Sequence, residues 1–538
     1  MKTRYVLLFL LAALVCLAGC IPNTTPEPPA TTQTVSTVAV NAESDATDTP
    51  SPTAAVTPTA IPTTPAPTPT AVPTTPAPTP TPYPTPPDNW VAPFELGGHV
   101  NTWDHVDAMR YAGMTWAKVQ VHYPKDAADI INTAHDNGLK IQITGMGSAS
   151  LIREKNFTAN YANWLATIAA QGADAIEVWT EPNIDREWPA GQIGPEAYTE
   201  LLCAAYATIK AANPDTAVIS AAPAPTGYFR GCSPDGCDDL PFLRGMLEAG
   251  AENCLDYVGA HHNAGATSPM ADIGHPADPG STHPSWYFLP QTNLYFDIFN
   301  GQRQLFYTEV GYASQEGVPT FHDMFNWAKA TTDAQQADWL VGAVNLGRST
   351  DKVYAMMIWN VDFERYGYDP QDGYAIIRPR GQCPACERLH NALVRTEAPP
   401  DQDRTALRLP WPAGEGHSII PQSPPNHPEG FSFDLSENEP VMAAHSGWVM
   451  EVGEDEVLGN VVMLCRDQDT SGECSRYAHL KIAGVVVGQY IERGQEIALA
   501  GDMLFFSMLK DGEPIPAAFK EMDGGTSSVS YYISQNTP

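Results

Sequence analysis

Ile176-Glu177-Val178-Trp179-Thr180-Glu181-Pro182-Asn183 joins an apolar, β-branched run to a tryptophan, and a carboxylate followed by a proline comes almost at once. Apolar runs of this kind form strands that are buried on both faces of a parallel sheet. In parallel α/β folds the functional side chains gather at the carboxyl ends of such strands. The stretch therefore predicts a buried strand that presents Glu181 at the functional edge of a sheet.

A second stretch has the same design. Leu305-Phe306-Tyr307-Thr308 is a strand-like run that ends in Glu309, with Gly311 just beyond. Cleavage of a glycosidic bond uses two carboxyl groups, one to protonate the leaving oxygen and one to attack the sugar or to activate water. Glu181 and Glu309 are therefore the candidate catalytic pair.

Strand and helix signals alternate from Asn89 onward. We expect strands at 94–100, 115–122, 139–145, 174–181, 215–222, 255–262, 304–310 and 352–360. We expect helices between them, notably at 124–137, 157–171, 195–212, 238–249 and 331–347. Eight strand–helix units in about 300 residues predict an α/β fold of the (β/α)8 TIM-barrel type. In this barrel Glu181 ends the fourth strand and Glu309 ends the seventh.

Three motifs resemble clan A glycoside hydrolases, a group of retaining enzymes: Trp179-Thr180-Glu181-Pro182-Asn183, Tyr307-Thr308-Glu309-Val310-Gly311-Tyr312 and Met357-Ile358-Trp359-Asn360. The resemblance extends over roughly residues 90–396. It implies that Glu181 is the acid/base and Glu309 the nucleophile. It also implies a sugar-binding set in which Trp359 forms the floor and His261 lies near the cleft. The full set is Trp179, Thr180, Asn183, His261 and Trp359.

Thr180 departs from the pattern of that clan, in which an asparagine usually precedes the acid/base and hydrogen-bonds the sugar 2-hydroxyl. Threonine offers one short hydroxyl in place of an amide. Contacts to the 2-hydroxyl strengthen in the transition state, so their loss slows the chemistry. The change is also compatible with a sugar substituted at that carbon, or with a barrel that only binds.

Composition excludes some classes of partner. The chain has 538 residues, 43% of them hydrophobic, and a formal net charge of −33. Such a negative charge argues against nucleic acid as a partner and against electrostatic binding to an anionic membrane. It fits an acidic extracytoplasmic protein.

The first 20 residues form a secretory signal. Lys2 and Arg4 precede an apolar run that reaches Leu17, too short to be a typical spanning helix. The ending Leu17-Ala18-Gly19-Cys20 resembles the bacterial lipobox, which implies lipidation of Cys20 and attachment to the bacterial cell membrane. Residues 21–87 are rich in Thr and Pro and predict an extended, disordered stalk.

Eight cysteines remain after Cys16 and Cys20 are set aside. Three pairs are close in sequence, and Cys203 and Cys254 are left over; the close pairs are Cys232/Cys237, Cys383/Cys386 and Cys465/Cys474. An even number in an oxidising compartment favours structural disulfides, whose connectivity the sequence leaves open.

Residues 399–538 predict an all-β domain with short strands, in runs such as 441–449, 460–464, 484–488 and 494–497. Around residues 405–525 it resembles the lysostaphin- and LytM-type zinc metallopeptidases, with matches at Asp434, Ala444-His445-Ser446-Gly447-Trp448-Val449 and Tyr477-Ala478-His479-Leu480.

The metal ligands of that family are incomplete here. Gly430 stands at the first-histidine position, for which His427 is a possible substitute. The late His-Leu-His-Phe is replaced by Met503-Leu504-Phe505-Phe506. Because methionine and phenylalanine cannot hold a zinc-bound water, the degenerate site of His427, Asp434 and His479 is expected to bind no metal.

The sequence therefore predicts four parts: a signal at 1–20, a stalk at 21–87, a glycoside hydrolase barrel at 88–398 and an inactive peptidase-like domain at 399–538. We expect a membrane-anchored retaining glycoside hydrolase that acts on a polysaccharide or oligosaccharide without a cofactor. Contact of the last domain with the cell wall is a further expectation. A non-catalytic binding lipoprotein and a peptidoglycan hydrolase are the alternatives.

Overall fold

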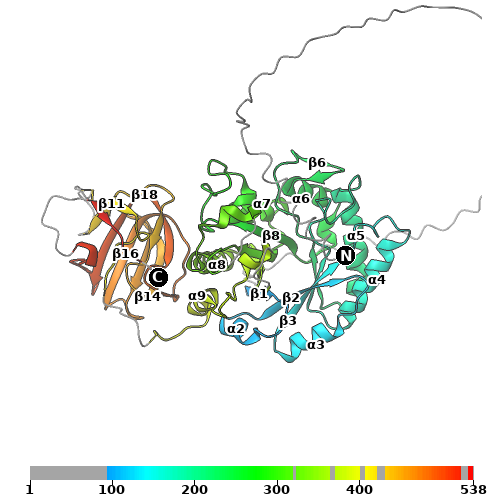
Figure 1. Cartoon of the computed structure of the whole chain (residues 1–538), viewed down its shortest axis with the longest axis horizontal. Coiled ribbons are helices and arrows are strands. Elements are labelled where there is room, and N and C mark those ends of the chain that lie inside the picture. Colours follow the sequence, from blue (N-terminus) through cyan, green and yellow to red (C-terminus); the bar gives the residue numbers. More distant parts are fainter. Residues whose placement is uncertain are drawn as a thin grey trace, which may run out of the picture. The chain divides into compact units, whose positions relative to one another are not determined.

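The computed structural model of the chain (Figure 1) describes residues 94–318, 323–363, 370–399, 406–420, 430–522 and 531–536. Within them the fold consists of a parallel barrel followed by an antiparallel β domain. The expected signal, with Cys20, and the expected stalk lie outside the described residues, as does His427. No helix in the described part of the chain is both long and apolar enough to cross a membrane.

Eight parallel strands form the barrel, in the spatial order β5-β4-β3-β2-β1-β10-β9-β8. They are β1 (Glu95–His99), β2 (Trp116–His122), β3 (Lys140–Met146), β4 (Ala175–Val178), β5 (Ala217–Ser220), β8 (Val258–Gly265), β9 (Leu305–Tyr312) and β10 (Val353–Ile358). A parallel bridge between Ile219 and Tyr257 links the two end strands. This bridge brings β5 beside β8, so the sheet closes on itself, and the predicted α/β barrel is confirmed.

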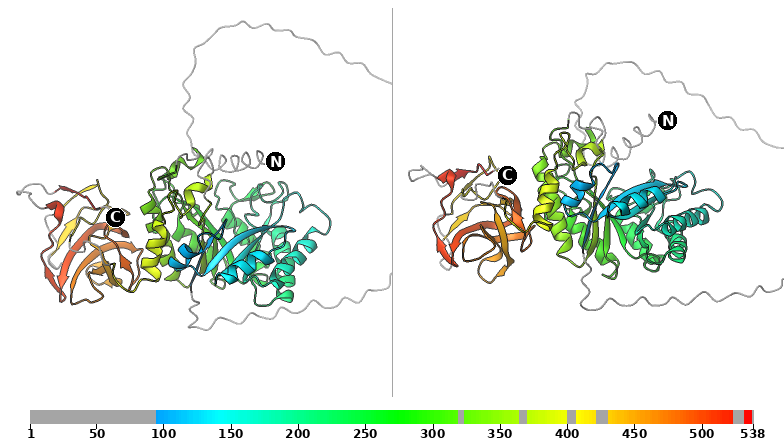
Figure 2. Two further views of the ribbon diagram at one scale, coloured as in Figure 1. Left: turned by 60° about the horizontal axis from the view of Figure 1, so that its bottom comes forward. Right: turned by 90° about the horizontal axis from the view of Figure 1, so that it is seen from below.

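Helices lie around this sheet, as the two further views in Figure 2 show. They are α2 (Val106–Tyr111), α3 (Ala128–Asp136), α4 (Phe157–Ala170), α5 (Pro195–Ala212), α6 (Asp239–Glu248), α7 (Phe288–Ile298), α8 (Asp333–Arg348) and α9 (Pro384–Leu393). Short 3-10 turns are η1 (Ala251–Asn253), η2 (Pro284–Trp286), η3 (Asp323–Ala328), η4 (Pro370–Tyr374) and η5 (Lys520–Met522). Thr332 begins α8 with a capping box, because its hydroxyl accepts the Gln335 N–H and the Gln335 side chain accepts the Thr332 N–H.

The barrel interior changes from apolar to polar along the strands. Near the strand beginnings, Trp116, Ala175, Ile219, Phe306, Ala355 and Met357 form a buried apolar cluster. Farther along the same strands the buried side chains are polar, including Lys118 and Glu177, both fully buried. The apolar layer closes one end of the barrel, and the polar groups converge toward the other end, where barrel enzymes place their chemistry.

Two details of the barrel differ from the prediction. The fourth strand ends at Val178 rather than at Glu181, because Trp179 and Glu181 take left-handed backbone angles, with φ of 75° and 44°. The region 263–290 is rich in Pro, Gly, His and Ser, a composition that predicts a loop, but it contains the end of β8, η2 and the first turn of α7.

The C-terminal domain is an antiparallel sheet in the order β12-β18-β16-β15-β14-β17, with β13 and β19 also paired to β18. Its strands are β12 (Phe431–Phe433), β13 (Pro440–Met442), β14 (Gly447–Asp455), β15 (Gly459–Cys465), β16 (Glu473–Ala483), β17 (Tyr490–Ile491), β18 (Glu496–Lys510) and β19 (Glu513–Ile515). A separate pair joins β11 (Gly416–Ser418) to β20 (Tyr531–Ile533). The predicted all-β class is confirmed.

One predicted strand of this domain is wrong. The run 484–488 is a loop that ends in a turn, in which Gly488 has a φ of 86°. Glycine adopts such a positive φ without a steric cost. The turn at Gly488 therefore ends the extended run that Val485, Val486 and Val487 predict.

Four disulfides are present: Cys203–Cys254, Cys232–Cys237, Cys383–Cys386 and Cys465–Cys474. The three local pairs and the remaining pair are therefore all joined, and structural disulfides are confirmed. Disulfides persist in oxidising compartments, so they indicate an extracytoplasmic protein.

Candidate active site

Glu181 lies just beyond β4, in a turn that aims its side chain at the polar end of the barrel. Its backbone N–H donates to the carbonyl of Ala222, at 2.9 Å. Its side chain is 11% exposed. One carboxyl oxygen lies within hydrogen-bond distance of His261 Nδ1, at 3.1 Å, and the carboxylate forms an ion pair with Arg186. The left-handed backbone at Glu181 is unusual for a residue other than glycine, and such backbones cluster at functional sites.

Glu309 lies within β9 and is buried, at 5% exposure. Lys118 Nζ donates to its Oε1 at 2.9 Å, and Asn263 Nδ2 donates to its Oε2 at 2.8 Å. Burial alone raises the pKa of Glu309, but the positive charges of His261, Lys118 and His99 outweigh it and lower this pKa to about 2. Glu309 is therefore a carboxylate throughout the physiological pH range.

His261, on β8, connects the two glutamates. Its Nδ1 lies 3.1 Å from Glu181 Oε1 and 3.7 Å from Glu309 Oε2. Burial lowers the pKa of His261, so the ring is neutral at neutral pH and Lys118 is then the main positive charge that Glu309 faces. Two oxygens near one nitrogen cannot lie farther apart than the two distances added together. The two carboxylates therefore share one site.

An aromatic surface lies beside this pair. Trp359 follows β10 and is half-buried. Its ring packs edge-to-face with His99, with ring centroids 4.8 Å apart, and its centroid lies 5.9 Å from Lys118 Nζ. Burial, more than the charge of Lys118, holds the pKa of His99 well below its ordinary value. A neutral histidine and a tryptophan ring are groups that bind the hydroxyls and the apolar face of a sugar.

Several buried polar atoms near the carboxylates have no hydrogen-bond partner among the described residues. They include Thr180 Oγ1, His99 Nδ1, Asn263 Oδ1 and His261 Nε2. A buried polar atom without a partner costs about 1–3 kcal/mol, so such atoms mark places where a ligand or water completes the bonding. Thr180 is thus one of the candidate sugar contacts, although its hydroxyl is short.

Trp179 and Asn183, two of the predicted sugar contacts, are engaged elsewhere. The Trp179 ring is buried against Phe157, Tyr161 and Trp188, and its indole N–H donates to the Glu187 carbonyl at 3.2 Å. Its place is therefore in the packing between β4 and the surrounding helices, where it fixes the turn that carries Glu181.

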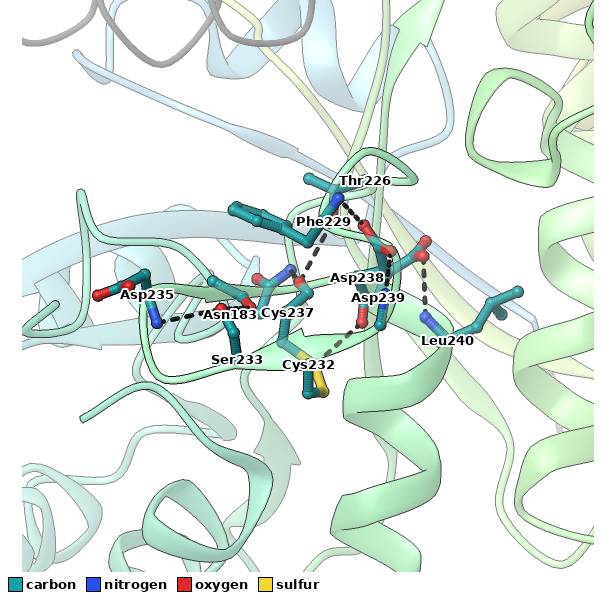
Figure 3. The surroundings of a disulfide bond; sticks show 12 residues. Asn183, Thr226, Phe229, Cys232, Ser233, Asp235, Cys237, Asp238, Asp239 and Leu240 are labelled. Atoms are coloured by element: carbon teal, nitrogen blue, oxygen red, sulfur yellow. Dashed lines mark hydrogen bonds between the residues drawn. A yellow bond between two sulfur atoms is a disulfide. The ribbon is translucent and has the colours of Figure 1, made fainter. Parts of the chain in front are cut away.

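Asn183 is fully buried beside the β6–β7 hairpin (β6, Cys232–Ser233; β7, Gly236–Cys237), as Figure 3 shows. Its Nδ2 donates to the carbonyls of Ala224 and Cys237, each at 2.9 Å, and its Oδ1 accepts the Ala224 N–H at 2.8 Å. These bonds use its side chain to hold the segment after Glu181 onto the disulfide hairpin.

Sequence reasoning assigned no contact with the two glutamates to three charged residues of the site. Lys118 lies in β2 and Glu177 in β4, and both are fully buried, whereas Arg186 lies in the turn after Glu181. Lys118 and Asn263 were recognisable as polar residues near strand ends, but nothing in the sequence indicated that they contact Glu309. A charged residue inside an otherwise apolar strand was the available signal for Lys118 and Glu177.

Among the described residues of the C-terminal domain, the candidate metal ligands do not gather into one site. Asp434 Oδ1 lies 3.4 Å from Nδ1 of His417, a histidine that sequence reasoning did not consider, and accepts the Ser418 N–H at 2.6 Å. Phe505 is fully buried in β18, at the position of the late histidine in the zinc enzymes. Among the described residues, no group of three or more His, Cys, Asp or Glu side chains is arranged to hold a metal ion. These residues therefore do not fit zinc.

Comparisons with known proteins found similar solved structures and one matching family model. A search of curated proteins found no match. Among solved structures, the chain is similar to the GH53 catalytic domain of Ignisphaera aggregans (13% identity, 56% of this chain and 92% of that chain, TM-score 0.39). It is also similar to the endo-1,4-beta-mannanase of Rhizomucor miehei (12% identity, 53% and 89%, TM-score 0.35).

The C-terminal part is similar to a zinc-containing peptidase from Vibrio cholerae (25% identity, 21% of this chain and 40% of that chain, TM-score 0.18). The chain thus spans less than half the length of that peptidase. Residues 426–515 match the model of Peptidase family M23. The chain therefore combines a parallel eight-stranded barrel with a C-terminal domain of the M23 type.

Proposed function

We propose that the barrel is a retaining glycoside hydrolase in which Glu309 is the nucleophile and Glu181 the acid/base. The observation that carries this proposal is the sharing of His261 Nδ1 by the two carboxylates, at 3.1 Å and 3.7 Å. Retaining enzymes hold their carboxyl groups about 5–5.5 Å apart, whereas inverting enzymes separate them by about 6.5–9.5 Å to admit a water. The two distances to His261 limit how far apart these two carboxyl oxygens can lie. This limit excludes most of the inverting range, so it favours retention.

In the first step, a Glu309 oxygen attacks the anomeric carbon and forms an ester with the sugar. The bond between that carbon and the leaving oxygen breaks, and Glu181 gives its proton to the leaving oxygen. The low pKa of Glu309, about 2, keeps the attacking group ionised. Its hydrogen bonds from Lys118 and Asn263 fix the orientation of the carboxylate.

In the second step, Glu181 takes a proton from a water molecule, whose oxygen attacks the anomeric carbon and releases Glu309. This step needs Glu181 as a carboxylate, the form that the adjacent Arg186 favours. The first step needs Glu181 protonated. Arg186 therefore opposes the first step and assists the second, and its displacement by a bound substrate would relieve this opposition.

The C-terminal domain is proposed to bind rather than to cut. Its M23-type fold is associated with cell-wall peptides, but the described residues do not supply a set of zinc ligands. Attachment to the membrane through lipidated Cys20, by way of the Thr- and Pro-rich residues 21–87, remains a proposal from the sequence.

Stereochemistry is the direct test of this mechanism. Once a cleaved glycan is found, proton NMR of the first-formed product reports its anomeric configuration before mutarotation. Retention predicts that the product has the configuration of the substrate. Inversion would mean that Glu309 activates water instead of attacking the sugar.

A further inference from the structure

Glu177 is a further buried carboxylate of the barrel, close to Glu181 and Glu309, and the mechanism above assigns it no role. It lies in β4, four residues before Glu181, and is fully buried. Its Oε1 accepts hydrogen bonds from Thr308 Oγ1 at 2.8 Å and the Ala222 N–H at 3.3 Å. Its Oε2 accepts from Thr144 Oγ1 at 2.7 Å and Gln142 Nε2 at 3.3 Å.

One side of this network leads to the nucleophile. Thr308, which donates to Glu177, precedes Glu309 on β9. Lys118 Nζ lies 3.8 Å from Glu177 Oε2 and donates at 2.9 Å both to the Thr308 carbonyl and to Glu309 Oε1. The ammonium of Lys118 is therefore shared between the buried carboxylate and the nucleophile.

The other side leads to the acid/base. The peptide N–H of Ala222 donates to Glu177, and the Ala222 carbonyl accepts the N–H of Glu181 at 2.9 Å. His261 Nε2 lies 3.9 Å from Glu177 Oε1, while Nδ1 of the same ring contacts Glu181. The Ala222 peptide thus lies between Glu177 and the backbone of Glu181, and the His261 ring lies between Glu177 and the side chain of Glu181.

We propose that Glu177 is a positioning residue that sets the placement of both catalytic glutamates through Thr308, Lys118, Ala222 and His261. This inference rests on the proposed glycosidase function. Every group that contacts Glu177 through a hydrogen bond donates to it. A carboxylate, which accepts only, satisfies all of them at once.

A glutamine at this position cannot do so. Its NH2 group would face either the Ala222 N–H on one side or the ammonium of Lys118 on the other. Either conflict shifts a neighbour of a catalytic glutamate. Because a misplacement of about 1 Å can cost about 100-fold in rate, the effect is expected in the chemical step.

The experiment compares Glu177→Gln with Asp239→Asn in otherwise wild-type protein. Asp239 is the control: it is a buried carboxyl group, with a pKa that burial raises to about 7, that accepts from Tyr295 at 2.6 Å and makes none of the contacts described for Glu177. On a substrate that the wild type cleaves, Glu177→Gln is expected to lower kcat about 10–100-fold, with KM changed less than about twofold. Asp239→Asn is expected to leave both within about twofold.

A second readout does not depend on turnover. The charged groups that face the His261 ring are Glu177, Glu181, Glu309, Lys118 and Arg186. Glu177 raises the pKa of His261 against the larger effect of burial. Loss of the Glu177 charge should therefore shift the NMR titration of His261 to lower pH, a change that Asp239→Asn should not cause. A His261→Gln variant identifies the signal.

Thr308→Val and Thr308→Ser keep the test decisive if Glu177→Gln does not fold. Valine removes the hydroxyl that donates to Glu177, whereas serine keeps it. The valine variant is expected to lose several-fold in kcat, and the serine variant to lose much less. Equal kcat values for the two Thr308 variants, or a folded Glu177→Gln with wild-type kcat, would overturn the inference while leaving the glycosidase intact. A wild-type protein that cleaves no glycan would overturn both.

Discussion

The Nζ atom of Lys118 lies 2.9 Å from Oε1 of Glu309, and neither side chain has more than a small exposed fraction. Removing two charges from water is costly, and only close pairing with further hydrogen bonds compensates for that cost. Here the ammonium also donates to the Thr308 carbonyl, and the carboxylate also accepts from Asn263. The pair therefore holds Glu309, the proposed nucleophile, in its ionised form and in one orientation.

Replacement of Lys118 by methionine is predicted to move the acidic limb of the pH–activity profile upward. The pKa of Glu309 is lowered to about 2, so in the wild type the nucleophile stays ionised as the pH falls well below 4. Without the ammonium, burial acts against the carboxylate, and the limb should shift by at least one pH unit. The stability contributed by this carboxylate is present above its ordinary pKa of 4.5 and is lost as the pH falls through about 2.

Lys118→Arg is the control, because it keeps the positive charge. Thermal unfolding of each variant separates the shift in the profile from a loss of folded protein. An unchanged acidic limb in a folded Lys118→Met protein would show that Lys118 does not control the nucleophile.

Arg186→Gln is predicted to move the basic limb of the same profile to higher pH. An adjacent positive charge favours the deprotonated carboxyl, so its removal lets Glu181 keep the proton for the first step at a higher pH. The measurement is kcat/KM against pH. Arg303→Gln is the control, because Arg303 lies just before the beginning of β9, at the end away from Glu309. It should leave the basic limb in place. An equal shift in both variants would exclude a specific role for Arg186.

Thr180→Val is predicted to lower kcat/KM about 3–10-fold. Valine has nearly the shape of threonine but lacks the Oγ1 that has no protein partner among the described residues. One hydrogen bond contributes about 0.5–1.5 kcal/mol, which sets this range. Thr180→Ser, which keeps the hydroxyl, should stay within about twofold of the wild type. If valine is tolerated as well as serine, the Thr180 hydroxyl does not contact the substrate.

The C-terminal domain is predicted to purify without stoichiometric zinc. Asp434 is paired with His417, and Phe505 is buried where a third ligand would be required. Metal analysis after growth with added zinc should give well below one equivalent, and Asp434→Asn should not change that value. One equivalent of zinc that Asp434→Asn abolishes would restore the peptidase interpretation.

The barrel could be predicted from sequence because its strands are short apolar runs separated by helical patterns. All eight predicted strand ranges overlap observed strands. The two glutamates of the proposed catalytic pair could be located for the same reason, since each follows such an apolar run at the end where barrel enzymes place their chemistry. The exact end of β4 was not, because it depends on left-handed backbone angles at Trp179 and Glu181 that local propensity does not indicate.

The supporting charges could not be placed from sequence. Lys118 and Glu309 are separated by 191 positions, and Glu177 and Thr308 by 131. Their contacts follow from barrel closure and not from any local pattern. For Asn183 the local motif predicts a sugar contact. In the structure its side chain instead hydrogen-bonds the backbone of Ala224 and of Cys237 in the disulfide hairpin.

The central claim is tested most directly by the release of reducing ends from a panel of plant, storage and cell-wall glycans. Residues 86–538 of the wild type would be compared with Glu309→Gln and with Glu200→Gln, an exposed control on α5. The account predicts release from at least one glycan by the wild type and by Glu200→Gln, and a loss of at least about 1000-fold in Glu309→Gln. Release by Glu309→Gln at the wild-type rate, or no release by folded wild-type protein from any glycan, would contradict it.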